Sequence, residues 1–335
     1  MKTDIVVGLQ FGDEGKGKAA SYLALKNKYD IVCKSNGGPN AGHTVVEDDG
    51  KVHKLQQLPG AAIYCHNVFI GAGAVINPAI LVREMKAYPH IVVAASPNCP
   101  IVLDKHIEID KKLEEKYNIG TTKQGIGPAY ADFALRTGKT LSIWLKEDTE
   151  DENRDYLLKN LNLEYEISHF NNVLIETSQG AKLDPFVGDY PYVTSSSPHP
   201  GFALASLQIS PFSVRHIYGV VKPYITYVGN NKLDYEFNEN LSKEIRDAGK
   251  EYGVVTGRPR RIAQWYPGIT RDWEIKNYGV TSLFINKTDI LTKINIPVDN
   301  TFYYGDIEGF KKNMGEFFDL KILYGTGPKT SEYEL

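Results

Sequence analysis

Short runs of apolar residues recur along the chain between polar or glycine-rich stretches, and they predict the strands of a sheet. The runs are rich in β-branched side chains, which pack well on a pleated surface. Several alternate with helical patterns, such as residues 19–25 after the first run. This alternation predicts an α/β fold with a largely parallel central sheet flanked by helices. The predicted strands are residues 5–7, 31–33, 68–70, 91–94, 173–175, 216–221, 226–228 and 282–285.

The first predicted strand leads into a glycine-rich stretch, residues 8–18, which reads GLQFGDEGKGK. Strand, glycine-rich turn and helix together form the usual setting of a phosphate-binding loop, and Lys16 adds a positive charge. Six residues separate Gly8 from Gly15, where the common loop has four, and Gly17 replaces the hydroxyl residue that holds Mg²⁺. Asp13 is therefore the candidate metal ligand in a P-loop-like, GTPase-related architecture. An ordinary turn between strand and helix is the alternative.

A second glycine-rich turn, residues 36–44, directly follows the predicted strand at 31–33. It contains Asn40, Gly42 and His43. Ligands in open α/β sheets collect beyond the carboxyl ends of the strands, so the two turns are expected to face one site. An imidazole gives or takes a proton near neutral pH, which makes His43 a candidate catalytic group.

These motifs, taken in order, resemble the adenylosuccinate synthetase family. Members of that family join a purine nucleoside monophosphate to L-aspartate and hydrolyse a nucleoside triphosphate. The resemblance covers nearly the whole chain, and its specificity comes from the order of many weak motifs. They lie at residues 12–18, 40–44, 120–130, 179–181, 190–196, 256–261, 286–289 and 325–328.

The composition of the chain bears on its domain organisation, its partners and its location. A chain of 335 residues buries a full core, and we expect one catalytic domain, residues 1–335, with a helical lobe near residues 145–170. The net charge of −3 favours neither a nucleic-acid nor a membrane partner. The three cysteines lack metal-binding spacing, and the N-terminus enters a strand without a signal peptide, so we expect a cytoplasmic protein.

The resemblance implies specific catalytic roles. Asp13 would remove the N1 proton of the purine and bind Mg²⁺, with the backbone carbonyl of Gly42 as a second metal contact. His43 would donate to the 6-oxygen, Lys16 would hold the transferred phosphoryl group, and Gln179 would bond the purine near its reacting oxygen. The triphosphate would lie against residues Gly12, Gly15, Lys16, Gly17 and Gly42.

The remaining matches imply three further subsites. The 5′-phosphate of the monophosphate would contact Asn40, Thr122 and Thr194, and Arg136 would reach it from the other subunit of a homodimer. An ordinary exposed arginine is the alternative for Arg136. L-Aspartate would bind residues Val254, Thr256, Arg258 and Arg260. The base of the triphosphate, guanine by the pattern of its motif, would bind residues Lys287, Asp289, Gly325 and Gly327.

The chain also departs from the cellular members of the family. It has Phe11 where they usually have Trp, Thr177 in place of a glycine, and Ser-Pro-His-Pro-Gly at residues 197–201. Thr177 is expected to crowd the acceptor pocket. The shorter chain and its opening segment resemble the viral branch, which acts on dGMP, although this chain keeps Asp13. We expect dGMP as the acceptor, with IMP as the alternative.

The donor and the protein class carry alternatives of their own. GTP is the expected donor, and ATP or dATP are its alternatives. A non-catalytic nucleotide switch is the alternative from another class of protein. Such a switch needs the phosphate loop and the Asn-Lys-Thr-Asp motif at residues 286–289. It does not need Gln179, Thr194 or the basic segment at 256–260.

Overall fold

A large, mostly parallel sheet forms the centre of the molecule. The computed structural model describes residues 1–164, 166–253, 257–298 and 307–335. The sheet has nine strands in the order β13-β12-β11-β8-β1-β7-β2-β5-β6, and every pair is parallel except β12 with β13. Its strands are β1 (Lys2–Gly8), β2 (Ile31–Lys34), β5 (Asn67–Ile70), β6 (Val92–Ala95), β7 (Asn172–Gly180), β8 (Val214–Val221), β11 (Ser282–Ile285), β12 (Lys321–Gly325) and β13 (Tyr333–Glu334).

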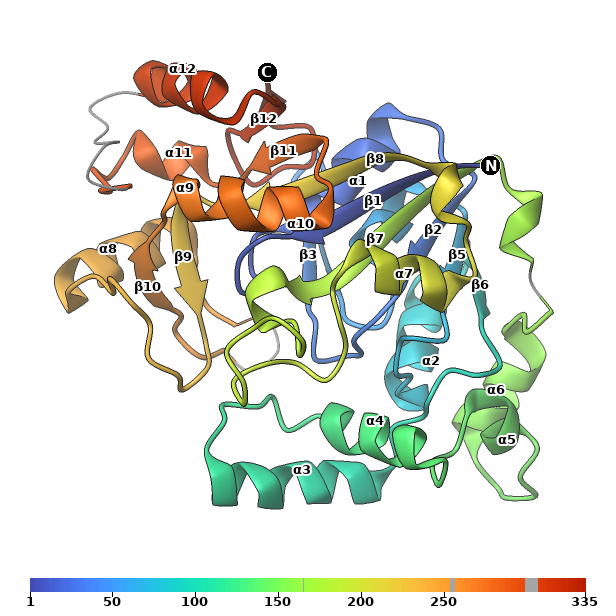
Figure 1. Cartoon of the computed structure of the whole chain (residues 1–335). Coiled ribbons are helices and arrows are strands. Elements are labelled where there is room, and N and C mark those ends of the chain that lie inside the picture. The colour runs from blue at the N-terminus through green and yellow to red at the C-terminus, as the bar shows by residue number, and fades with distance from the viewer. Residues whose placement is uncertain (165, 254–256, 299–306) are drawn as a thin grey trace.

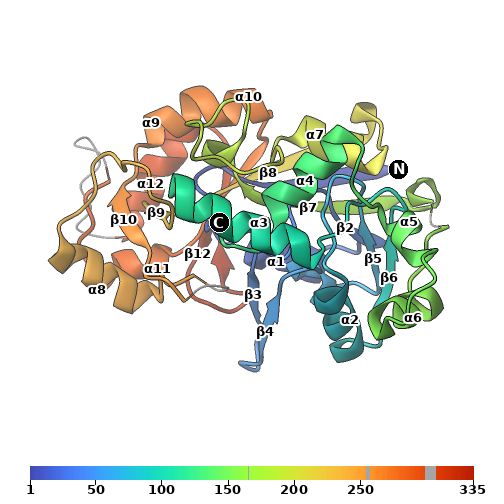
Figure 2. The same ribbon diagram turned by 90° about the horizontal axis from the view of Figure 1, so that it is seen from below.

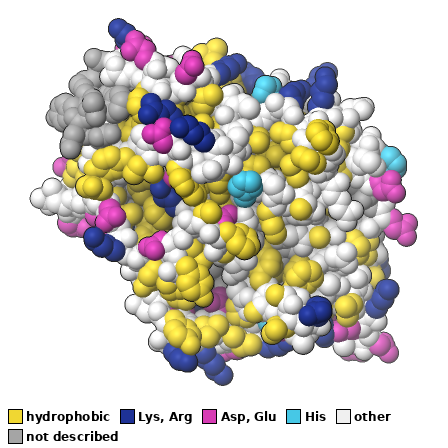
Figure 3. Space-filling model, viewed as in Figure 1, with side chains coloured by type: hydrophobic (Ala, Val, Ile, Leu, Met, Phe, Trp, Pro, Cys, Tyr) yellow, Lys and Arg dark blue, Asp and Glu magenta, His cyan; other side chains and the backbone are white. Residues whose placement is uncertain are grey.

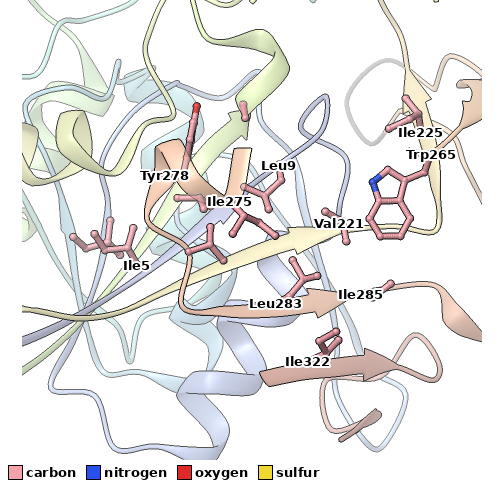
Figure 4. Packing of buried hydrophobic residues seen from close by; sticks show 14 of the residues in the cluster. Ile5, Leu9, Val221, Ile225, Trp265, Ile275, Tyr278, Leu283, Ile285 and Ile322 are labelled. Atoms are coloured by element: carbon pink, nitrogen blue, oxygen red, sulfur yellow. The ribbon is translucent and has the colours of Figure 1, made fainter. Parts of the chain in front are cut away.

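Both faces of this sheet are buried, as parallel sheets require. Alternate residues of a strand point to opposite faces. In β1, Val6 joins the apolar cluster under helix α1 (Lys16–Lys26), whereas Ile5 and Val7 join the larger cluster on the other face. Figure 4 shows part of this larger cluster, in which Leu283 and Ile322 of neighbouring strands lie under a helical segment that carries Ile275 and Tyr278.

The two faces are covered by helices that are dispersed along the chain, as Figure 1 shows. The longer ones are α2 (Pro78–Ala87), α3 (Asp104–Tyr117), α4 (Ile126–Leu135), α6 (Glu152–Asn160), α7 (Pro200–Leu207), α8 (Glu239–Gly249) and α12 (Ile307–Phe318). The shorter ones are α5 (Leu141–Leu145), α9 (Pro267–Ile269), α10 (Lys276–Tyr278) and α11 (Thr288–Leu291), with a π-helical turn at Thr270–Ile275 and single-turn 3₁₀ segments at Gly60–Tyr64, Ile167–His169, Ala181–Leu183 and Pro211–Ser213.

Two small antiparallel sheets extend from the central one. Strands β3 (His43–Val46) and β4 (Val52–Leu55) form a hairpin that projects from the body in Figure 2. Strands β9 (Tyr224–Tyr227) and β10 (Arg261–Gln264) pair beside helix α8. Because β9 directly follows β8, this second small sheet carries the basic segment toward the end of the central strands.

The predicted α/β class is confirmed, and each predicted strand overlaps an observed one. The run at 226–228 lies in the small antiparallel sheet rather than in the central one, because β9 turns back to pair with β10. The turn after β5 leads into helix α2, whose first turn is capped by the Asn77 side chain, which accepts from the backbone N–H of Ile80.

The outer surface is mixed in character. Acidic and basic side chains are interspersed on the face seen in Figure 3, with apolar side chains between them. In the described part of the chain, no helix is long and apolar enough to cross a bilayer. The buried apolar side chains form clusters that flank the sheet.

Candidate active site

The predicted site residues gather at the carboxyl edge of the central strands. Strands β1, β7, β8, β2 and β11 run in the same direction, so the segments that follow them emerge at one edge. These segments are the glycine-rich loop after β1, the turn after β2, the bend at Gln179, the residues after β8 and the turn that starts at Asn286. Segments distant in sequence thereby form a single site.

The glycine-rich loop wraps around a buried carboxylate, that of Glu14. One of its oxygens, Oε1, accepts from the backbone N–H groups of Gln10 (2.9 Å) and Gly12 (2.7 Å). A Cβ on Gly8 or Gly180 would lie 2.4 Å from a Glu14 carboxylate oxygen, so both positions must be glycine for this side chain to fit. Glu14 thus accepts from backbone amides of the kind that bind phosphate.

Lys16 is held in the same cluster. Its ammonium donates to the Glu14 carboxylate at 2.9 Å and to the Gly12 carbonyl at 3.0 Å, and the side chain is buried. Gly15 precedes helix α1 with a φ of 88°, a left-handed conformation that favours glycine. Asn286 fixes this turn, because its side-chain amide donates to the carbonyls of Glu14 (2.7 Å) and Gly15 (3.1 Å).

His43 lies under the second turn with one ring nitrogen occupied and one not. Its Nδ1 lies 2.7 Å from the Glu176 carboxylate, and both side chains are buried. Its Nε2 is buried and has no hydrogen-bond partner among the described residues. Burial by itself raises the pKa of Glu176, but the attraction and hydrogen bond of His43, with the amides of Ala61 and Gly60, bring it below its ordinary value.

A buried lysine braces the same turn. Lys34, at the end of β2, donates to the carbonyls of Gln56 (2.7 Å) and Gly38 (3.3 Å). Burial lowers the pKa of Lys34 to about 8, although the carboxylates of Glu84 and Glu176 oppose that shift. The turn that carries His43 is therefore hydrogen-bonded to a buried lysine side chain.

Gln179 and Asn36 meet across the strands β7 and β2. The side-chain amide of Asn36 donates to Gln179 Oε1 at 3.3 Å, and its carbonyl oxygen accepts from the Ser178 backbone N–H at 2.8 Å. Gln179 has a φ of 61°, which turns the chain out of the strand. Asn40 accepts from the Gly38 N–H at 3.1 Å, and Gly42 lies half-buried between Asn40 and His43.

Asp13 forms an ion pair with Arg260 across the site. Arg260 Nη2 donates to Asp13 Oδ1 at 2.9 Å, and Arg260 Nε lies 2.9 Å from Oδ2. The Asp13 side chain stays 28% exposed, so ligands can reach it. On its other side, Arg260 donates to the buried carboxylate of Glu251 at 2.5 Å.

The predicted base-binding residues lie together at the ends of β11 and β12. Lys287 has a φ of 63° and donates to the Gly249 carbonyl at 2.7 Å, while Asp289 in α11 pairs with Lys293. Gly325 accepts at its carbonyl from Thr288. Gly327 lies against Glu332, where a Cβ would be 2.3 Å from a carboxylate oxygen, and its carbonyl accepts from Lys18 at 2.6 Å.

Other predicted residues lie on the surrounding loops. Thr122 and Thr194 are half-buried, and Arg136 is exposed at the end of α4 with a φ of 63°. Arg258 lines a hollow of about 510 Å³ together with Glu114 and Lys123. Val254 and Thr256 lie outside the described residues. In the part of the chain that is described, no three His, Cys, Asp or Glu side chains group as a metal site would require.

The structure also corrects one expectation and adds residues that the sequence did not single out. Thr177 is fully buried and donates to the Val6 carbonyl at 3.1 Å, so it lies inside the sheet rather than crowding the acceptor pocket. The added residues are Glu14, Glu176 and Glu251. Glu14 carries a sequence signal, an acid two positions before Lys16. The partner of Glu176 lies far away in sequence, whereas Glu251 pairs with Arg260 nine positions further on, and nothing in that spacing marks the pair.

Comparison with known proteins agrees with this arrangement. The family model described as Adenylosuccinate synthetase matches residues 5–169 and 158–328. The adenylosuccinate synthetase of Shouchella clausii is 35% identical over 383 aligned positions, which cover 99% of this chain and 88% of the relative. That of Thermoplasma volcanium is 33% identical and covers 96% of this chain and 84% of the relative. The chain belongs to the adenylosuccinate synthetase family.

Solved structures extend the comparison. The fully ligated adenylosuccinate synthetase of Plasmodium falciparum superposes with a TM-score of 0.87 at 28% identity, covering 99% of each chain. The succinoaminodeoxyadenylate synthetase of cyanophage S-2L, bound to dGMP and dATP, gives 0.79 at 22% identity and covers 99% of this chain and 95% of the other. The present chain is therefore a C–N ligase that joins L-aspartate to a purine nucleotide at the expense of a nucleoside triphosphate.

Proposed function

We propose that this enzyme converts dGMP and L-aspartate into N6-succino-2-amino-2′-deoxyadenylate, with GTP as the phosphoryl donor. IMP is the alternative acceptor, and ATP and dATP are the alternative donors. The observation that carries the assignment of the site is that three groups lie on segments at the same strand edge. These are the Asp13 carboxylate, the Nε2 of His43, which has no partner in the described part of the chain, and the side chain of Gln179 beside Asn36.

The proposed reaction has two steps. In the first, the purine loses its N1 proton, the 6-oxygen forms a bond to the γ-phosphorus, and GDP leaves. In the second, the amine of aspartate forms a bond to C6, and inorganic phosphate leaves with the former 6-oxygen. A purine 6-oxygen is a weak nucleophile until N1 is deprotonated, so the first step needs a base next to N1.

Asp13 is the proposed base, and its partial exposure lets a purine approach it. His43 is the proposed donor to the 6-oxygen. Since its Nδ1 faces the Glu176 carboxylate, Nε2 is the ring nitrogen left to face the 6-oxygen. A donor aimed at developing charge stabilises the transition state more than the ground state.

The proposed phosphate subsite is the glycine-rich loop with Lys16, Gly12, Gly15, Gly17 and Gly42. Positioning and electrostatic stabilisation supply most of the catalysis of phosphoryl transfer. Mg²⁺ neutralises phosphate charge when it is bound. Mg²⁺ sites in such enzymes use one or two carboxylates and several phosphate oxygens. The partly exposed carboxylate of Asp13, with the backbone carbonyl of Gly42, would supply protein oxygens of this kind.

Two further subsites are proposed beside the phosphate loop. Arg258 and Arg260 would bind the carboxylates of L-aspartate, together with Val254 and Thr256, since arginine offers planar bidentate donors. Asp289 would accept from guanine, with Lys287, Gly325 and Gly327 as the other walls. Support for this placement is that Asn286, next to Lys287, also holds the phosphate loop through Gly15.

The choice of dGMP rests on the rim of the acceptor subsite, which contains Asn40, Thr122 and Thr194. Next to it, residues 197–201 fold into a capped helix start: His199 Nδ1 accepts from Gly201 N–H at 3.0 Å. This rim differs in sequence from that of cellular members, and the S-2L synthetase with the same fold was solved with dGMP. Two prolines in this segment have no backbone N–H, so hydrogen bonds that cellular enzymes donate from these positions cannot form here.

We also propose a homodimer in which Arg136 completes the acceptor subsite of the partner subunit. Arg136 ends helix α4, and two large apolar neighbours, Phe133 and Leu135, are 40% and 70% exposed. Exposed apolar side chains around an arginine are typical of the centre of an interface.

Two measurements test the proposal. A ligase releases phosphate only when L-aspartate, a purine monophosphate and the triphosphate are all present, whereas a nucleotide switch hydrolyses GTP alone. A steady-state panel of IMP, dIMP, GMP and dGMP against GTP, ATP and dATP then decides the substrates. We expect the highest kcat/KM for dGMP with GTP. A higher value for IMP contradicts the acceptor, and faster turnover with ATP or dATP contradicts the donor.

A further inference from the structure

Arg260 uses its guanidinium in two directions at once. The Nη1 side faces Glu251 Oε2 at 2.5 Å, inside the protein. The opposite side faces Asp13. There Nη2 donates to Asp13 Oδ1 at 2.9 Å, and Nε lies 2.9 Å from Oδ2 but has no hydrogen-bond partner among the described residues. This side of the guanidinium therefore binds a carboxylate, which in this structure is that of Asp13.

Two buried donors besides Arg260 hold Glu251. Its Oε1 accepts from Lys222 Nζ at 3.1 Å and from the Tyr224 hydroxyl at 2.8 Å, and its side chain is fully buried. Lys222 Nζ also donates to Thr226 at 2.6 Å. Burial lowers the pKa of Lys222 to about 8, while the charge of Glu251 opposes that shift. A carboxylate buried this deeply is held in one orientation.

The backbone ties the same residues to the site. Arg260 N–H donates to the Glu251 carbonyl at 3.0 Å, so the two ends of the segment 251–260 are joined. Lys222 exchanges two hydrogen bonds with the side chain of Gln10, at 2.9 Å and 3.2 Å, and Gln10 belongs to the glycine-rich loop. Glu251 is thus linked through Lys222 to Gln10, a residue of the loop that forms the proposed phosphate subsite.

We propose that Glu251, held by Lys222 and Tyr224, is a positioning residue that keeps the Nη2 group of Arg260 turned toward a carboxylate. In this structure the carboxylate is that of Asp13, and in the reaction it is a carboxylate of L-aspartate. The inference rests on the proposed aspartate subsite. It follows that L-aspartate displaces Asp13 from Arg260 as it binds, which leaves the Asp13 oxygens available for the purine.

The chain offers a matched control for this role. Arg261, the next residue, also pairs with a glutamate, Glu236. It does so through two hydrogen bonds, from Nε and Nη2, and this pair lies at the surface and is about one-third exposed. Glu251→Gln and Glu236→Gln are therefore the same chemical change at neighbouring arginines. Only Glu251 contacts the arginine that faces Asp13.

We expect Glu251→Gln to raise the KM for L-aspartate about tenfold or more, because a hydrogen bond between charged groups is replaced by a weaker one. The KM values for the monophosphate and for GTP should change less than about threefold, since both bind to other groups. Glu236→Gln should leave all three constants within about twofold of wild type, as expected for a surface pair. A uniform change in all three constants would indicate a merely structural role and would overturn the proposal.

Tyr224→Phe covers the case in which Glu251→Gln does not fold. It removes one donor to Glu251 and keeps the ring, so thermal unfolding should stay near that of wild type while the KM for L-aspartate rises about threefold. An unchanged KM in Tyr224→Phe, or in folded Glu251→Gln, overturns the proposal. A wild-type enzyme that releases phosphate without L-aspartate contradicts the proposed function instead, so the two failures are distinguishable.

Discussion

Asp13 is the residue on which most of the proposed chemistry depends, and it forms an ion pair with Arg260. We predict that Asp13→Asn lowers the ligation rate by at least about 10²-fold, since general-base catalysis contributes roughly 10²–10⁴-fold. Binding of the monophosphate should persist, because the 5′-phosphate contacts lie elsewhere. Rapid-quench ligation rates and equilibrium binding of dGMP measure the two effects. A variant that keeps more than about a tenth of the wild-type rate is incompatible with a catalytic base at this position.

His43 depends on Glu176 in the same way that Arg260 depends on Glu251. Replacing Glu176 with Gln keeps the shape of the side chain and removes the negative charge next to Nδ1 of His43. We predict a fall in kcat of about tenfold or more, because a charged partner is lost. Steady-state kinetics of both enzymes measure this effect. An equal kcat for wild type and Glu176→Gln would show that the carboxylate does not support His43.

At the scale of elements, the glycine-rich loop and the end of β7 must approach closely. A Cβ on Gly180 would lie 2.4 Å from the Gln10 carbonyl and from Glu14 Oε1. We predict that Gly180→Ala destabilises the protein by about 1–3 kcal/mol, the usual cost of overpacking, and weakens GTP binding. Thermal unfolding and GTP titration measure both effects.

Gly315→Ala, in the middle of α12, is the matched control for this change. A Cβ at Gly315 meets no heavy atom within 4 Å, and alanine is favoured over glycine in a helix by about 0.5–1 kcal/mol. The control variant should therefore be slightly more stable than wild type and bind GTP normally. Equal losses in both variants would mean that the close approach at Gly180 is not responsible.

At the scale of the whole molecule, the proposed dimer can be tested by complementation. Arg136→Leu should raise the KM for the monophosphate more than that for L-aspartate, because its proposed contact is the 5′-phosphate. Mixing it with an inactive Thr194 variant should restore activity through hybrid dimers, in which one site has both residues intact. Sedimentation gives the assembly state of each variant. A monomer with no recovery of activity on mixing would refute shared sites.

The buried ion pairs also give the whole protein a defined acid sensitivity. Burial by itself raises the pKa of Glu251, but Lys222, Arg260 and Lys287 attract its carboxylate and lower the pKa to about 2, below the ordinary 4.5. The folded protein therefore gains stability from this carboxylate above pH 4.5, and the gain is lost as the pH falls toward 2.

Glu251→Gln lacks this contribution, so the difference in Tm between wild type and variant should shrink from about pH 5 downward. Glu236→Gln is again the control, because its surface pair contributes little to stability at any pH. A Tm difference between wild type and Glu251→Gln that stays constant across this range would contradict the linkage.

The sequence by itself determined the fold class, the positions of most central strands and the motifs at their carboxyl ends. These features are local, since apolar runs, glycine spacing and residue type are all read within a few positions. The run at 226–228 was assigned to the wrong kind of sheet, because strand pairing depends on which segment lies beside it. Thr177 was misplaced for the same reason, as nothing local shows which face of β7 it occupies.

Only the tertiary structure decided which charged groups meet. Glu176 lies 133 positions from His43 in sequence, and Arg260 lies 247 positions from Asp13, yet each pair is in contact. A carboxylate in a strand gives no local sign of its partner, because burial and pairing arise when parallel strands bring their carboxyl ends to one edge. The sequence thus supplied the reacting groups, and the folded sheet supplied the buried carboxylates that orient them.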